Sequence, residues 1–148
     1  MNLAKSIDHT LLKPDAVQSE IETLCAEAAE NGFFSVCVNT SWVPVAAAAL
    51  RDHDVAIAAV TGFPLGAMST VAKAFETGRA VADGASEIDT VLHVGRLKQG
   101  DSRYVREDLE AVVSAAAGRT AGSQSGCSPS GSHDTAGCTT SCNNNALR

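Results

Sequence analysis

No stretch of the sequence is long and apolar enough to cross a membrane, since a spanning helix needs roughly 20 apolar residues. Basic residues are too few to attract nucleic acid or an anionic membrane: 11 Lys and Arg stand against 17 Asp and Glu, a formal charge of −6. The first residues, MNLAKSIDHTLL, contain neither a long apolar core nor a small-residue cleavage site. We therefore expect a cytoplasmic protein with a small diffusible partner, and neither nucleic acid nor a membrane.

Cysteine is scarce and odd in number, which argues against a complete disulfide framework. Cys25 and Cys37 lie among apolar residues and are typical of reduced core thiols in a cytosolic protein. The other three lie with a histidine in a polar stretch, spaced C-x5-H-x4-C-x3-C: Cys127, His133, Cys138 and Cys142. A zinc module there is an alternative, but paired C-x2-C spacing and apolar support are absent. Chance is the better interpretation, and we predict no metal site.

What the sequence does contain is a repeated alternation of strand and helix patterns in a chain that is 45% hydrophobic. The predicted strands are Ser6–Leu12, Phe33–Asn39, Val55–Val60 and Ser86–Val94. The predicted helices begin near Ser19, Ser41, Thr70 and Ser102, and the last two end at Asp83 and Ala117. Strands separated by helical crossovers run parallel, so we expect an α/β fold of about four βα units. Four units make an open half of a barrel, with sites at the carboxyl ends of the strands.

The helix patterns also predict caps and buried faces. Ser19 with Glu22 is typical of a capping box at the start of the first helix. In the third helix the spacing favours burial of Val71, Ala74, Phe75 and Gly78. The same spacing exposes Lys73, Glu76 and Arg79, where Lys73 is expected to pair with Glu76. In the fourth helix the expected buried face comprises Val105, Leu109, Val112, Val113 and Ala116.

After Gly118 the periodicity stops. Residues 119–148 are dominated by Ser, Gly, Thr, Asn and Cys and show neither a helical nor a strand period. We therefore divide the chain into residues 1–118, which fold, and residues 119–148, an irregular tail. We expect the tail to be disordered and to supply no strand.

A carboxylate stands in the middle of the fourth predicted strand, EIDTVLHVG at 87–95. Period-two parity puts Asp89 on one face with Glu87, Val91 and His93. The same parity in the other strands collects polar groups on one inner face: Asp8, Thr10, Cys37, Asn39 and Asp89. Such groups converging from several strands are typical of a barrel active site. The pattern leaves other interpretations open. Asp89 could be a structural buried acid, Cys37 a thiol that fills the core, and Gly62–Gly66 a plain strand-to-helix turn.

Five segments carry a more specific signal: IDHTLLKP at 7–14, VCVN at 36–39, VTGFPLG at 60–66, K-x-x-E at 73–76 and GASEIDTVLHVGRLKQG at 84–100. In order and spacing they resemble bacterial deoxyribose-phosphate aldolase, from Met1 to about Gly118. Two positions depart from the family pattern. Thr40 stands where the family usually has Pro, and His93, which parity places beside Asp89, stands where Asn is usual.

The resemblance implies a partial TIM barrel, a (βα)8 fold, and a class I aldolase. Such an enzyme is a lyase that converts 2-deoxyribose 5-phosphate to glyceraldehyde 3-phosphate and acetaldehyde with no metal or organic cofactor. A lysine on the sixth strand forms the Schiff base with acetaldehyde. By the motif match, Asp89 is the proton donor and acceptor, working with a second lysine and a water. Motif match and parity make Asp8, Thr10, Cys37 and Asn39 pocket residues.

The family's K-T-S-T-G-F-like motif and its late glycine-rich phosphate loops are absent from these 148 residues. The four lysines, Lys5, Lys13, Lys73 and Lys98, match other motifs. We therefore expect an inactive, marginally stable half, able to self-associate through unpaired sheet edges. The alternative is a non-catalytic fragment that keeps part of a sugar-phosphate pocket.

A frameshift near Gly118 would explain the change in composition. If residues 129–132 were encoded CCT-TCT-GGA-TCA, reading one base later would give Leu-Leu-Asp, which suits the strand that the family has there.

Overall fold

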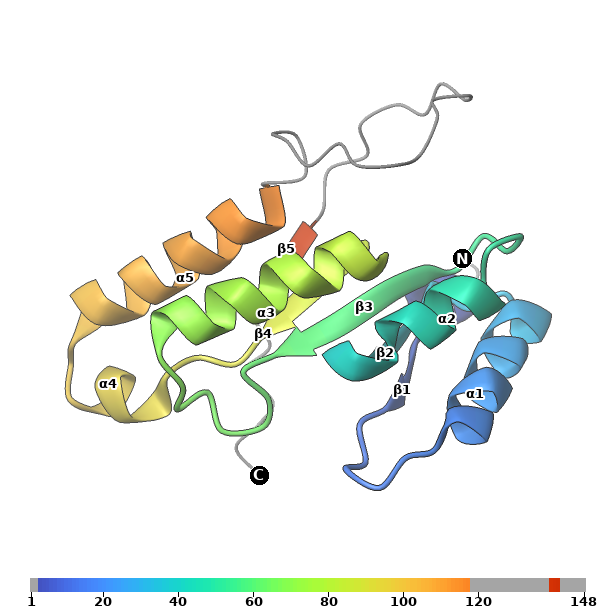
Figure 1. The fold of residues 1–148 in the computed structure, drawn as a ribbon, viewed down its shortest axis with the longest axis horizontal. Helices are drawn as coiled ribbons and strands as arrows, with labels where there is room; N and C mark the ends of the chain where they lie inside the picture. The colour runs from blue at the N-terminus through green and yellow to red at the C-terminus, as the bar shows by residue number, and fades with distance from the viewer. Residues whose placement is uncertain (1–2, 118–138, 142–148) are drawn as a thin grey trace.

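In the computed structural model, which describes residues 3–117 and 139–141, strands alternate with helices (Figure 1). The strands are β1 (Asp8–Leu11), β2 (Ser35–Asn39), β3 (Ala56–Thr61), β4 (Glu87–Thr90) and β5 (Thr139–Ser141). The α-helices are α1 (Gln18–Asn31), α2 (Val43–Ala49), α3 (Thr70–Asp83), α4 (Val94–Lys98) and α5 (Ser102–Ala117). Two 3-10 helices, η1 (Leu3–Ser6) and η2 (Thr40–Trp42), complete the elements. The predicted α/β alternation is confirmed.

The strands form one parallel sheet in the order β1-β2-β3-β4-β5. Each long helix packs on the one before it, α1 on α2, α2 on α3 and α3 on α5. Figure 1 shows these helices along one side of the strands. Neighbouring βα units therefore follow one another in space in the order of the sequence, as in half of a βα barrel.

The main core lies between the helices and the sheet. The strands contribute five buried residues to it: Val36, Val38, Ile57, Ala59 and Ile88. Alternate residues face the other way, where the buried apolar cluster is small: Cys37, Ala58 and Val60, with Leu12 against it. The two-residue period of the strands thus separates an apolar helix-side face from a more polar inner face, as parity predicted.

The first helix begins earlier than the capping pattern predicted. Val17 is the N-cap, in extended conformation, and its N–H donates to Glu20 at 2.9 Å. Glu22, the expected partner of Ser19, instead accepts from the Gln18 amide at 2.8 Å. The Ser19–Glu22 capping box is therefore wrong, because the carboxylate that reaches back to the N-cap lies three residues after Val17.

The third helix has the predicted bounds but buries a different face from the one predicted. Val71 is 79% exposed and Phe75 is 77% exposed, whereas Lys73 is fully buried at 0%. Thr77, Ala80 and Val81 share the buried face. The expected exposed Lys73–Glu76 pair is wrong because α5 presents Asp108 to the buried face, where it pairs with Lys73. Apolar spacing alone could not reveal an ion partner 35 residues away.

Three further expectations differ from the structure. The fourth strand ends at Thr90, and residues 94–98 form α4 instead of extending it. Val113 is 50% exposed, outside the buried face of α5. The tail was expected to supply no strand, but Thr139–Ser141 pairs with β4. An open strand edge offers unpaired backbone groups, and threonine favours the extended conformation, so a short pairing forms there. The rest of the predicted tail lies outside the described residues.

Candidate active site

The strand register places the predicted site residues on one face of the sheet. Thr10 pairs with Cys37, which pairs with Ala58 and then Glu87. One step nearer the carboxyl ends, Asn39 pairs with Val60 and Val60 with Asp89. Residues at one level of a parallel sheet point to the same side. Asn39 and Asp89 therefore share the level nearest the carboxyl ends, where sites of βα folds form.

Asp8 lies at the opposite end of the same face, level with Ser35. The Ser35 hydroxyl donates to the Asp8 carboxylate at 2.6 Å, and the Thr10 hydroxyl donates to the Asp8 carbonyl at 2.8 Å. The Ser35 bond ties β1 to β2 on the inner face, whereas the Thr10 bond lies within β1. Of the five predicted site residues, Asp8 thus lies furthest from the level of Asp89.

The Cys37 thiol is buried in the middle of the inner face. Burial, followed by the negative charges of Asp89 and Asp8, raises the pKa of Cys37 from 9.0 to about 12. A hydrogen bond with the Thr10 side chain opposes this shift only in part. The thiol is therefore neutral near pH 7 and is suited to lining the face, not to attacking a substrate.

Glu76 is a residue whose importance the sequence pattern missed. Its carboxylate accepts from the Thr40 hydroxyl at 3.0 Å and from the Gly62 N–H at 2.9 Å. It thereby joins the segment after β2 to the loop after β3, both at the carboxyl ends of the strands. Thr40, which departs from the family pattern, supplies one of the two bonds. The K-x-x-E spacing was the available signal, but it was interpreted as a surface pair.

The loop after β3 is a tight turn held against the segment after β4. Gly66 N–H donates to the Gly62 carbonyl at 2.7 Å, and the Phe63–Pro64 peptide is cis. A Cβ at Gly66 would lie 2.1 Å from the Leu92 carbonyl oxygen, and its φ is +63°. Only glycine fits there without displacing backbone. The geometry agrees with the strand-to-helix turn that pattern favoured.

Lys73 and Asp108 form a buried ion pair on the helix side of the sheet. Lys73 Nζ also donates to the Val91 carbonyl at 2.9 Å, just after β4. Within the described residues, the Thr61 and Thr90 hydroxyls and the second Asp108 oxygen have no hydrogen-bond partner. The ion pair thus holds the ammonium on the helix side of the sheet. Sequence spacing did not indicate it, because the apolar residues of α3 predicted a different buried face and Asp108 lies on another helix.

His93 lies beyond the end of β4, so the strand parity that placed it beside Asp89 does not apply to it. The strand ends at Thr90, and His93 instead begins α4, where its Nδ1 accepts from the Arg96 N–H at 3.4 Å. Its ring packs edge-on against Tyr104, with centroids 5.5 Å apart, and the Arg96 guanidinium lies over the same Tyr104 ring. Period-two parity fails here because the backbone is no longer extended.

Across residues 3–117 and 139–141, no group of three or more His, Cys, Asp or Glu side chains is placed to hold a metal ion. In the same described part, no helix is both long and apolar enough to cross a membrane. Cys25 and Cys37 are free thiols. The candidate zinc residues Cys127, His133, Cys138 and Cys142 lie outside the described residues.

Comparison with known proteins identifies relatives of the first 120 residues. A family model described as DeoC/LacD family aldolase matches residues 3–120. Deoxyribose-phosphate aldolase from Bdellovibrio bacteriovorus is 58% identical over 120 residues, covering 81% of this chain and 54% of the relative. Deoxyribose-phosphate aldolase 1 from Bacillus licheniformis is 53% identical over 117 residues, covering 79% and 52%.

A solved structure from Coccidioides immitis, described as a candidate deoxyribose-phosphate aldolase, superposes with a TM-score of 0.76 at 41% identity. The superposition covers 78% of this chain and 46% of that structure. The chain therefore spans about half the length of the curated relatives it matches, in their N-terminal part. The expected fold, the N-terminal half of a TIM barrel, is confirmed by these matches and by the four parallel βα units.

Proposed function

The chain belongs to the DeoC/LacD aldolase family, and from that membership we propose that it is the N-terminal half of a deoxyribose-phosphate aldolase. The reaction is reversible cleavage of 2-deoxyribose 5-phosphate to glyceraldehyde 3-phosphate and acetaldehyde, through a lysine Schiff base. The observation that carries the proposal is Asp89, which lies in the family motif and shares the carboxyl-end level of the inner face with Asn39.

The proposed chemistry assigns Asp89 to proton transfer. In a class I aldolase a lysine amine condenses with the acetaldehyde carbonyl, and loss of a proton gives the enamine that attacks the second aldehyde. A carboxylate at hydrogen-bonding distance from the reacting carbon or its water can take and return that proton. Asn39 would orient a substrate hydroxyl, while Thr10 and the neutral Cys37 thiol line the face and Asp8 holds β1 against β2.

None of the four lysines of the chain is proposed as the nucleophile. Lys73 is buried on the helix side in its pair with Asp108, and Lys5 is bound at the surface by Asp54 at 3.5 Å. Lys13 and Lys98 are exposed and lie outside the strands. The family lysine belongs to the part of the relatives that this chain does not match. We therefore propose that these 148 residues alone do not turn over substrate.

Borohydride trapping tests the proposal. The 148-residue chain and the Bdellovibrio relative are each treated with acetaldehyde and borohydride and compared by intact mass and peptide mapping. We expect a stoichiometric adduct on one lysine of the relative and only trace, scattered alkylation of this chain. A stoichiometric adduct on any one lysine of this chain would refute its inactivity.

The second candidate function is a non-catalytic fragment that keeps part of a sugar-phosphate pocket. It is favoured by the inner face, which retains Asn39 and Asp89 at one level. Thermal shift with 2-deoxyribose 5-phosphate tests it, with inorganic phosphate as the control ligand. A shift specific to the sugar phosphate and lost in Asp89→Ala would support the pocket, and equal shifts with both ligands would exclude it.

A cytoplasmic location and a sugar-phosphate partner are part of the same proposal. The free, buried thiols Cys25 and Cys37 support a reducing compartment.

A further inference from the structure

We propose that the outer face of α5 and the outer edge of β4 together dock the complementary half of the barrel as a separate polypeptide. The partner would add a parallel strand to β4 and lay its first helix against α5. The identity of this partner rests on the proposed function. The surface itself rests on the groove, the strand edge and the order of the helices.

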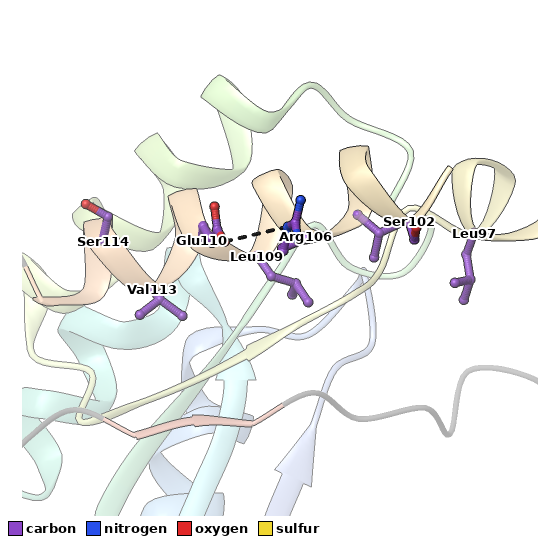
Figure 2. A pocket seen from close by; sticks show the side chains of 8 residues that line it. Leu97, Ser102, Arg106, Leu109, Glu110, Val113 and Ser114 are labelled. Atoms are coloured by element: carbon purple, nitrogen blue, oxygen red, sulfur yellow. Dashed lines mark ion pairs between the residues drawn. The ribbon is translucent and has the colours of Figure 1, made fainter. Parts of the chain in front are cut away.

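The groove lies along α5 and α4 and has a volume of about 510 Å³. Figure 2 shows Leu97, Leu109 and Val113 projecting to the same side of these helices. Val105 completes the apolar lining, and the Arg106–Glu110 pair, 3.9 Å apart, lies on α5 among these residues. Val113 is half exposed and Leu97 is 48% exposed. The described chain therefore leaves an apolar stripe of α5 uncovered, which is the kind of face that a packing helix buries.

The outer edge of β4 is competent to accept a parallel strand. Thr139–Ser141 pairs there, with Glu87 opposite Thr139 and Asp89 opposite Ser141. This pairing involves three residues, whereas β2 and β3 pair through five. A longer strand supplied by the partner would form more backbone hydrogen bonds along this edge and would replace β5.

The order of the helices indicates what belongs in the groove. Each long helix packs on its predecessor, α5 packs on α3, and the side of α5 that carries Val113 is left half exposed. In a right-handed series of βα units the next helix lies on the opposite side of α5, where the groove is. The chain matches 54% of the Bdellovibrio relative, so nearly half of a related barrel remains to supply that helix.

A second copy of this chain fits the surface less well. To continue the parallel sheet it would pair its β1 edge with β4 and set its α1 beside α5. The groove between β1 and α1 is lined by Glu20 and Glu27, with His9 bound to Glu27 at 2.7 Å. Setting these carboxylates against the apolar side of α5 would remove their charge from water and offer them no polar group there.

The test co-expresses the full 148-residue chain with the tagged remainder of the Bdellovibrio relative, the part that follows its matched segment. We expect a 1:1 complex in tag purification and sedimentation. Val113→Asp should weaken the complex at least about tenfold, because it buries a charge in the groove. Val71→Asp is the control: it lies on α3 and is even more exposed to solvent (79%, against 50% for Val113), and it should leave binding unchanged.

The outcomes separate this inference from the proposed function. No complex, or a complex equally affected by both variants, would overturn the docking surface. A homodimer of this chain that Val113→Asp dissolves would overturn the choice of partner. A specific complex that fails to trap acetaldehyde on the partner's lysine would leave the docking in place and contradict the aldolase proposal. A complex that traps it stoichiometrically supports both.

Discussion

At the scale of single residues, the surroundings of Cys37 on the inner face keep its thiol protonated. The pKa of Cys37 is raised to about 12, first by burial and then by the charges of Asp89 and Asp8. The neutral thiol is thus favoured in the folded chain. Between pH 9 and pH 12 the unfolded chain loses this proton while the folded chain keeps it, so stability falls as pH rises through that window. Below pH 9 the contribution is fully present.

We predict that Cys37 resists alkylation by iodoacetamide at pH 8 in the folded chain and reacts readily in urea. Peptide mapping after timed quenching measures both rates at this one position. Cys25, whose burial raises its pKa to about 11, is the internal comparison and should be protected in the same way. Rapid modification of Cys37 without urea would show that the thiol is accessible and ionised, against the burial described above.

The buried pair of Lys73 and Asp108 makes a second prediction at this scale. Lys73→Met leaves the Asp108 carboxylate buried without its cation, which costs about 3–5 kcal/mol of the free energy of unfolding. Urea denaturation followed by circular dichroism measures the loss. The double variant Lys73→Met with Asp108→Leu removes both charges and should recover most of it, even where the single variant is too unstable to fold.

Lys5→Met is the matched control for Lys73→Met, since Lys5 pairs with Asp54 in an exposed bridge of 3.5 Å. Exposed ion pairs contribute little to stability, so the urea midpoint of the Lys5→Met variant should hardly change. Equal losses of stability from Lys5→Met and Lys73→Met would mean that burial is not what makes the Lys73–Asp108 pair costly to break.

At the scale of elements, strand parity was predictable from sequence and helix orientation was not. Alternation in β2 and β4 placed Cys37, Asn39 and Asp89 on one face because the strand period is fixed at two residues. In α3 the apolar stripe through Val71 and Phe75 predicted the wrong buried face. The deciding contact, Lys73 with Asp108, joins two helices and leaves no local signal.

The candidate site shows the same division. The motif match indicated Asp89 and Asn39, and the register puts them at one level. The loop arrangement around them was not predictable, because Glu76 joins Thr40 to Gly62 across elements far apart in the sequence. Parity could not place His93, because β4 ends at Thr90 and His93 caps the helical turn that follows.

The loop between β3 and α3 gives the prediction at this scale. Gly66→Ala would bring a Cβ to 2.1 Å from the Leu92 carbonyl at a φ of +63°, so we expect a loss of more than about 1 kcal/mol in the free energy of unfolding. Gly78→Ala is the matched control, since it lies within α3 with no atom within 4 Å of the added Cβ. It should stabilise the chain by about 0.5–1 kcal/mol.

Both glycine variants are measured by urea denaturation under identical conditions. Opposite signs for the two alanine substitutions are the expected result. A Gly66→Ala chain as stable as the parent would mean that the loop does not hold this position against the segment after β4.

For the molecule as a whole, the two faces of the sheet are unequally completed. The helix side holds a continuous core drawn from four helices and the strands, whereas the inner face has a buried apolar cluster of three residues. In a closed barrel that inner face is filled by side chains from the opposite strands. Under the proposed function, folding stability and catalysis depend on the same partner strands.

The last prediction concerns the origin of residues 119–148. The family match ends at residue 120, and the composition changes at the same place. We propose that the coding sequence shifts frame near Gly118, so that reading it one base later restores an apolar strand followed by a helix of the aldolase family. Sequencing the gene across codons 115–148 tests this, with the unshifted frame as the control. A shifted frame that encodes no alternation of apolar residues, or that stops at once, would contradict the frameshift. Residues 119–148 would then not derive from an aldolase coding sequence read in the wrong frame.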